Sequence, residues 1–277
     1  MINMDETGIS YSSGKITNLR NLSHSSIKTF NQCARKFLLK NQLPRQPTSP
    51  AFLIGRAFHK TIETMIRNKE DVGLEESKRN LNQYWETSWE SSLGEAEQKE
   101  GIDWECTSPE QNKGVGTLML MVPEIIEALC KLRPQTDEAG IYLERRVELR
   151  VPGVPIPVIG YIDMKDDMGT LVEFKTAGRA WSDNQATREV QPLFYLAAVQ
   201  QQEGGTNLEF IHYVFTKTKN PKVQVFRTTR TQGEIMWLME TIREIWEQIE
   251  AGIFPRNPEG CFAYHKPCPY LNICWGK

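Results

Sequence analysis

The chain has 277 residues, of which 39% are hydrophobic and 25% are charged, a composition typical of a soluble globular protein. Its net charge of −2 excludes a global basic field, so any contact with nucleic acid must depend on a local groove. No apolar run is long enough to cross a membrane, and the N-terminal segment lacks the basic and apolar regions of a signal peptide. We therefore expect a cytoplasmic protein. In that reducing compartment, clustered cysteines are more often metal ligands than disulfide partners.

The hydrophobic pattern changes period near the middle of the chain. Helical periodicity dominates the first half, and short apolar or alternating runs typical of strands follow. We expect one helix over residues 23–38 that carries Cys33, then helices over 51–68 and 114–132 on either side of a polar, Trp-rich stretch. Strands are expected over 141–151, 156–165 and 170–176, then a helix over 183–202, strands over 208–216 and 222–228, and a helix over 233–251. This order predicts a mixed α/β (α+β) core that follows a helical arm.

The most informative stretch is a predicted hairpin that carries three charged residues. Asp163 lies near the end of one strand, and Glu173 and Lys175 lie on the next. Positions 163 and 173 are symmetrical about position 168, so antiparallel pairing places the two carboxylates opposite each other. The period of two puts Glu173 and Lys175 on one face of the strand. A divalent cation would reverse the repulsion between the carboxylates, and Lys175 could neutralise charge on a phosphate.

A Glu-x-Lys pair alone is more often a solvated strand face than a catalytic site. Further residues favour catalysis. The Asp163 and Glu173-x-Lys175 pattern resembles the PD-(D/E)XK nucleases, most closely their RecB-like group. His59, within the run Gly-Arg-Ala-Phe-His, resembles the histidine that a preceding helix supplies in that group.

A second motif of that group has the form Gln-x-x-x-Tyr and is matched by Gln191 and Tyr195. The spacing places both side chains on one helical face. Pro192 inside the motif must either start or kink this helix.

The resemblance implies a restriction-endonuclease-like core, a mixed sheet flanked by helices. It implies a single domain over 23–277 after a disordered or extended lead-in, with the arm at about 51–135, the core at about 140–250 and a cysteine lobe made of 23–40 and 252–277. It implies catalytic roles for the following residues: Asp163, Glu173, Lys175, Gln191 and Tyr195. Mg²⁺ or Mn²⁺ would be held by His59, Asp163, Glu173 and the backbone carbonyl of Phe174.

Three cysteines gather near the C-terminus, at positions 261, 268 and 274. With Cys33 they resemble the four ligands of a 4Fe-4S cluster in RecB-like and CRISPR-associated nucleases, a cluster that would join the two ends of the chain. Six residues separate Cys261 from Cys268, more than in much of the family. Zn²⁺ with His265 therefore stays open as an alternative. Cys106 and Cys130 have no partners at ligand spacing, and we expect ordinary buried thiols.

The resemblance implies a metal-dependent DNA exonuclease that acts on single-stranded or end-containing DNA, in phage or CRISPR-type recombination, repair or spacer processing. Its partners would be recombination, replication or CRISPR adaptation proteins. The alternative is a catalytically silent nuclease-like module that binds DNA or a partner. Candidate contacts to the DNA backbone are Arg179, Arg188, Lys217 and Lys219, although the segment with the two lysines also fits a solvated turn. Trp181 could stack on unpaired bases.

Overall fold

The computed structural model describes residues 2–4, 10–12, 16, 18–265 and 267–276. Its centre is a five-stranded sheet in the order β5-β6-β7-β8-β9. All neighbours pair antiparallel except β7 and β8, which are parallel. The strands are β5 (Leu143–Leu149), β6 (Val158–Lys165), β7 (Leu171–Ala177), β8 (Glu209–Thr216) and β9 (Val223–Thr229). The predicted mixed α/β class is confirmed.

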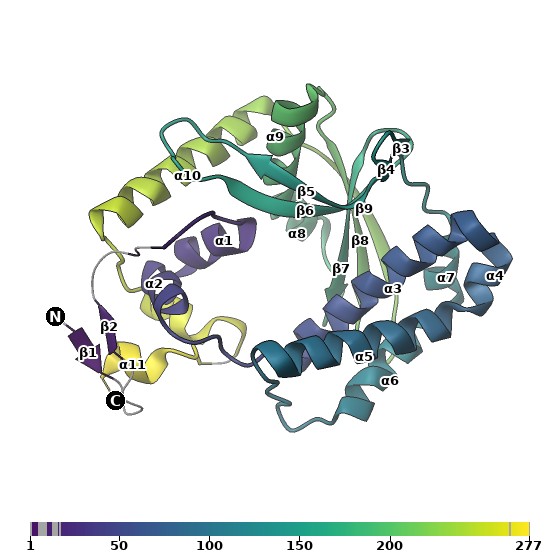
Figure 1. Cartoon of the computed structure of the whole chain (residues 1–277), viewed down its shortest axis with the longest axis horizontal. Helices are drawn as coiled ribbons and strands as arrows, with labels where there is room; N and C mark the ends of the chain where they lie inside the picture. Colours follow the sequence, from purple (N-terminus) through teal and green to yellow (C-terminus); the bar gives the residue numbers. More distant parts are fainter. Residues whose placement is uncertain (1, 5–9, 13–15, 17, 266, 277) are drawn as a thin grey trace.

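Helices cover both faces of this sheet, and each face has its own apolar core (Figure 1). The first core joins the sheet to α1 (His24–Gln32), α2 (Ala34–Gln42), α9 (Gln191–Glu203) and α10 (Gln232–Ala251). The second joins it to α3 (Pro50–Val72), α5 (Leu81–Lys99), α6 (Pro109–Leu120) and α7 (Pro123–Cys130). The central strands, buried from both sides, carry the near-continuous apolar runs seen in the sequence.

The helical arm consists of α3 to α7, including the short α4 (Leu74–Arg79). Its packing depends on one glycine, Gly116 in α6, because a Cβ there would lie 2.1 Å from the Trp85 indole. Trp85 is fully buried in α5. The absence of a side chain at position 116 thus lets two helices approach closely.

Three predicted helices are each broken in two, and local backbone chemistry accompanies each break. Cys33 adopts an extended conformation with φ −166° and separates α1 from α2. Pro123 begins α7 and ends the continuity with α6, because proline lacks the amide hydrogen that a continuous helix needs. The third break separates α8 (Asp183–Arg188) from α9, and Pro192 lies at the N-terminus of α9, so it starts the helix and does not kink it.

The remaining elements lie near the chain ends and in one small hairpin. The lead-in contains a short antiparallel pair, β1 (Ile2–Met4) and β2 (Ser10–Ser12), and a second pair joins β3 (Thr136–Asp137) and β4 (Gly140–Ile141). The C-terminal segment forms η1 (Pro258–His265) and α11 (Leu271–Trp275), and α11 packs beside α2 (Figure 1). Within the described residues, no helix combines the length and apolarity needed to cross a membrane.

Candidate active site

The hairpin of β6 and β7 brings two carboxylates together. Met164 pairs with Val172, and the same register places Asp163 opposite Glu173, as the symmetry about position 168 predicts. The strands diverge at this point, and the Phe174 amide donates to Asp163 Oδ2 at 2.6 Å. Asp163 and Glu173 are only 7% and 4% exposed, so two acidic groups share a poorly solvated space.

Helix α3 supplies a histidine to these carboxylates. Its Gly55 packs against β7, where a Cβ would meet Thr176 Oγ1 at 3.0 Å, and His59 follows one turn later. His59 Nδ1 lies 3.5 Å from Asp163 Oδ1. Burial acts to lower the pKa of His59, but Asp163 and Glu173 together outweigh burial, and the pKa is raised from its ordinary value. The structure therefore couples His59 electrostatically to the hairpin.

The sequence analysis missed a third acid, Glu144. The pairs Leu143 with Met164 and Arg145 with Ile162 place it opposite Asp163 on the neighbouring strand. Ligand atoms of His59, Glu144 and Asp163 all lie within 4.8 Å of one another. Glu144 has a left-handed backbone with φ 47°, and burial together with Asp163 raises its pKa to about 7. No spacing motif marks this residue; only the strand register, unknown from sequence, brings it to the site.

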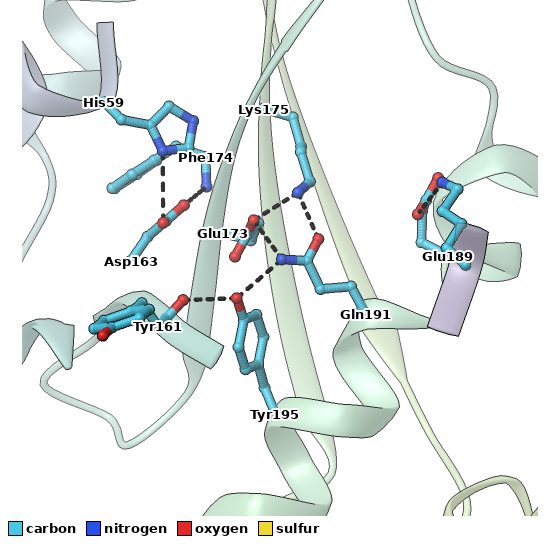
Figure 2. A network of polar contacts seen from close by, with 10 residues as sticks. His59, Tyr161, Asp163, Glu173, Phe174, Lys175, Glu189, Gln191 and Tyr195 are labelled. Carbon is cyan, nitrogen blue, oxygen red and sulfur yellow. Dashed lines mark hydrogen bonds and ion pairs between the residues drawn. The ribbon is translucent and has the colours of Figure 1, made fainter. Parts of the chain in front are cut away.

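On the other side of Glu173, a hydrogen-bond network holds Lys175 (Figure 2). The Lys175 amine donates to Glu173 Oε1 at 2.5 Å and also to the side-chain oxygen of Gln191. The Gln191 amide nitrogen donates to Glu173 Oε1 at 2.8 Å and to the Tyr195 hydroxyl at 3.0 Å. That hydroxyl donates to the backbone carbonyl of Tyr161 at 2.6 Å. Gln191 and Tyr195, four residues apart on α9, thus connect β6 and β7.

The charges in this network shift the pKa of its members. Burial raises the pKa of Glu173 to about 7, with Asp163 adding to the shift and Lys175 opposing it. Burial acts to lower the pKa of Lys175, but Glu173, with Asp163 and Glu189, more than compensates and the pKa is raised. The amine is therefore held in its charged form beside carboxylates that resist ionising together. Neighbouring ionisable groups with shifted pKa values are typical of catalytic sites.

The donor set fits a divalent cation. Glu173 Oε2 is buried and has no hydrogen-bond partner among the described residues. His59 offers one imidazole nitrogen, and Glu144 and Asp163 offer two further carboxylates. Carboxylate oxygens suit Mg²⁺ and Mn²⁺, and an added imidazole suits Mn²⁺ as well. Glu173, an expected ligand, lies outside the group of three, and its Oε1 is engaged by Lys175 and Gln191.

A cavity of about 730 Å³ opens onto these residues. His59, Glu144, Asp163 and Lys175 line it together with Arg56, Lys60 and Lys217. Lys217, a candidate DNA contact, donates to the Ala51 carbonyl at 2.8 Å, and burial lowers its pKa to about 8. The other candidates do not line this cavity in the described part of the chain: Arg179 and Lys219 are exposed, and Arg188 borders a separate hollow of about 210 Å³.

The four predicted cluster cysteines lie in the lobe where the chain ends meet. Cys33, at the break between α1 and α2, and Cys261, in η1, are each 8% exposed. The Cys268 amide donates to the Cys261 carbonyl at 2.6 Å. Burial raises the pKa of Cys268, and Cys261 and Cys33 are close enough to add to the shift. Cys274, in α11, packs with Cys268 against a small apolar cluster.

All six cysteines are free thiols. Among the described residues, the group of potential metal ligands formed by His59, Glu144 and Asp163 includes none of these cysteines. The side chain of His265, the alternative ligand, lies outside the described residues. Cys130 is buried as expected, whereas Cys106 is exposed, which corrects the prediction of a buried thiol. Cys106 lies in a loop with φ 68°, away from either core.

Acidic side chains on three adjacent strands of a mixed sheet thus lie beside a lysine and a helix-borne histidine, and three of these residues could hold a metal ion. A profile described as the PD-(D/E)XK nuclease superfamily matches residues 21–275. The chain therefore belongs to the PD-(D/E)XK nuclease superfamily, and the match covers both the site and the cysteine lobe.

Two solved structures are similar to this chain. A candidate exonuclease from Eubacterium rectale shares 15% sequence identity with a TM-score of 0.52, over 86% of this chain and 84% of that chain. This likeness supports the fold alone. The structure of SSO0001 shares 12% identity with a TM-score of 0.36, over 90% of this chain and 94% of that chain. A search of curated proteins gives no match.

Proposed function

We propose that this protein is a metal-dependent DNA exonuclease that hydrolyses phosphodiester bonds of single-stranded or end-containing DNA. The observation that carries the proposal is the convergence of His59, Glu144 and Asp163 within 4.8 Å, inside a cavity that Lys175 also lines. A module that only binds DNA has no need for buried carboxylates that repel one another. Membership of the nuclease superfamily supports the same conclusion.

The residues of this chain have separate roles in the proposed reaction. Lys175, held by Glu173 and Gln191, places a positive charge where charge develops on the scissile phosphate and can orient the attacking water. Gln191 and Tyr195 fix the distance between the two strands, so the lysine does not need to reorganise during the reaction. Tyr195 acts through Gln191 and is a positioning residue.

Metal ligands in this proposal are His59, Asp163 and Glu173, with the Phe174 carbonyl and with Glu144 added from the structure. Bound Mg²⁺ or Mn²⁺ would supply Lewis-acid stabilisation and lower the pKa of a water molecule. Glu173 could contribute Oε2, the carboxylate atom that has no protein partner in the described residues. His59 can bind a metal only in its neutral form, so metal affinity should rise with pH.

A 4Fe-4S cluster on Cys33, Cys261, Cys268 and Cys274 is the proposed second cofactor. Support for a shared cofactor comes from the burial of Cys33 and Cys261 and from the backbone hydrogen bond that joins Cys268 to Cys261. A tetrahedral Zn²⁺ site is the alternative. Protein purified without oxygen should be brown and lose its colour in Cys268→Ser, whereas colourless protein with one bound zinc would contradict the cluster.

The proposed setting is recombination, repair, phage replication or CRISPR spacer processing in the cytoplasm, with proteins of those processes as partners. Lys217, Arg179, Arg188 and Lys219 are the proposed contacts to the DNA backbone. Of these, Lys217 has the strongest support because it lines the cavity of the site.

Release of label from DNA tests the proposal. Strands labelled at the 5′ or the 3′ end, single or double, are incubated with Mg²⁺, Mn²⁺ or chelator. We expect metal-dependent release that falls by orders of magnitude in Glu173→Gln and Lys175→Ala. Glu250→Gln, an exposed position at the end of α10, is the matched control and should keep full activity. Equal behaviour of all four proteins would reject catalysis and favour a silent DNA- or partner-binding module.

A further inference from the structure

Two large aromatic side chains remain exposed on the wall of the catalytic cavity. Phe52 is 59% exposed and Tyr161 is 54% exposed, although most large apolar residues of this chain are buried. Both line the same cavity as His59 and Asp163. Leaving an aromatic ring in water is unfavourable, so an exposed pair within one functional cavity suggests that a ligand covers it.

The two rings are fixed to the elements that carry the metal-site residues. Phe52 precedes His59 by seven residues on α3, and two helical turns place both on one face. Tyr161 precedes Asp163 by two residues on β6, so both point to the same side of the sheet. The Tyr195 hydroxyl holds the backbone of Tyr161 through its carbonyl at 2.6 Å. Figure 2 shows the Tyr161 ring directed away from Gln191 and Tyr195.

Positive charge accompanies these rings. The Arg56 guanidinium carbon lies 5.1 Å from the centre of the Phe52 ring and also pairs with Glu100 at 3.6 Å. The amines of Lys60 and Lys217 line the same cavity. Aromatic faces interleaved with cations match a strand of nucleic acid in which bases alternate with phosphates. Lys60 also pairs with Glu95 at 2.8 Å, and Lys217 donates to the Ala51 carbonyl, so phosphates would share these cations with the protein partners they already have.

We propose that Phe52 and Tyr161 stack on the bases of nucleotides that flank the scissile phosphate, so that the site selects unpaired DNA. This inference rests on the proposed function, because it places DNA in the catalytic cavity. Bases within a duplex already have neighbours on both faces and cannot stack on a protein ring without opening. Base stacking depends little on sequence, since every base has an aromatic face. Selection should therefore favour single strands of any sequence.

Binding in chelator tests the inference without cleavage. Fluorescence anisotropy measures binding of a labelled oligothymidine, an abasic oligomer of equal length and a duplex. Phe52→Ala and Tyr161→Ala should each weaken oligothymidine binding by about 10-fold, as aromatic removal does in single-strand binders. Tyr161→Phe should bind like wild type. Neither alanine variant should change binding of the abasic oligomer or the duplex. Trp237→Ala is the matched control, because Trp237 is 52% exposed on α10 and does not line the cavity.

Wild-type affinity for oligothymidine in both alanine variants would overturn the inference. An equal loss for the abasic oligomer would also overturn it, because that result reports lost charge or shape and not stacking. Thermal unfolding of each variant confirms that it is folded. Label release separates this inference from the proposed function. Base-dependent binding without cleavage would reject the nuclease and keep the stacking site. Cleavage with unchanged binding in the variants would keep the nuclease and reject the stacking site.

Discussion

Replacement of Glu173 by glutamine should stabilise the metal-free protein at pH 8 while it abolishes nuclease activity. The carboxylate is 4% exposed, and its Oε2 has no partner among the described residues. Burial and Asp163 raise its pKa to about 7 from an ordinary value of 4.5. A charge at this position therefore destabilises the metal-free fold, and an amide of the same shape removes that charge.

The sign of the pH dependence of stability follows from proton binding at Glu173. Between pH 4.5 and about 7, the folded protein holds a proton on Glu173 that the unfolded chain has lost, so stability falls as pH rises across this window. The shift corresponds to at most about 3 kcal/mol, since one pKa unit is about 1.4 kcal/mol. The new amide nitrogen would occupy the place of Oε2 without an acceptor, and this unpaired donor would offset about 1 kcal/mol of the stabilisation. We expect a net gain of about 1–2 kcal/mol at pH 8.

Thermal unfolding in chelator, recorded from pH 5 to pH 8, measures this difference. The variant should unfold a few degrees above wild type at pH 8, at about 2–4 °C per kcal/mol for a protein of this size, and the gap should narrow toward pH 5. The comparison cancels the contributions of His24 and His212, whereas His59 and Glu144 also titrate differently in the variant because Glu173 raises the pKa of both. Glu250→Gln should track wild type throughout. A variant no more stable than wild type at pH 8, or a gap independent of pH, would refute the argument that a buried charge is the cause.

Three further predictions test packing, positioning and backbone strain. Gly116→Ala should lower the free energy of unfolding in urea by about 1–3 kcal/mol or more. Gly114→Ala, in open space on the same helix, should raise it by about 0.5–1 kcal/mol. Tyr195→Phe removes the hydroxyl that links Gln191 to β6, and it should lower kcat about 10-fold with little change in KM. Unchanged kcat would show that the hydroxyl is dispensable. Glu144→Gly should be more stable than Glu144→Ala by about 1 kcal/mol in thermal unfolding, because the backbone at position 144 has a positive φ. At Glu148, on the same strand, the alanine variant should instead be more stable than the glycine variant.

The sequence predicted the order of the core elements because each element carries a clear hydrophobic period. Asp163 and Glu173 were predicted to face each other because a short hairpin leaves one favoured register, and the observed pairing agrees with it. His59, Gln191 and Tyr195 came from the family resemblance and not from periodicity. The structure places all three beside the hairpin, and their catalytic roles stay predictions.

Other features depend on contacts that a linear pattern does not contain. Glu144 reaches the site through the pairing of β5 with β6, and the strand sequence alone does not reveal that register. The break at Cys33 lies inside an amphipathic run, so the period predicted one continuous helix. Phe52 falls within the helix predicted over residues 51–68, and only the folded arrangement shows that its side chain is exposed in the cavity.

The unfavourable features of this molecule concentrate at one place. Glu144 has a left-handed backbone, Glu173 Oε2 is buried without a hydrogen-bond partner in the described part of the chain, and both carboxylates resist ionisation. A divalent cation would relieve the repulsion and supply the missing partner, so the same groups that destabilise the metal-free fold would stabilise the metal-bound one. Because a ligand stabilises only the state that binds it, the unfolding temperature should rise with Mn²⁺ concentration, and more steeply at pH 8 than at pH 6, where protons compete for the carboxylates and for His59.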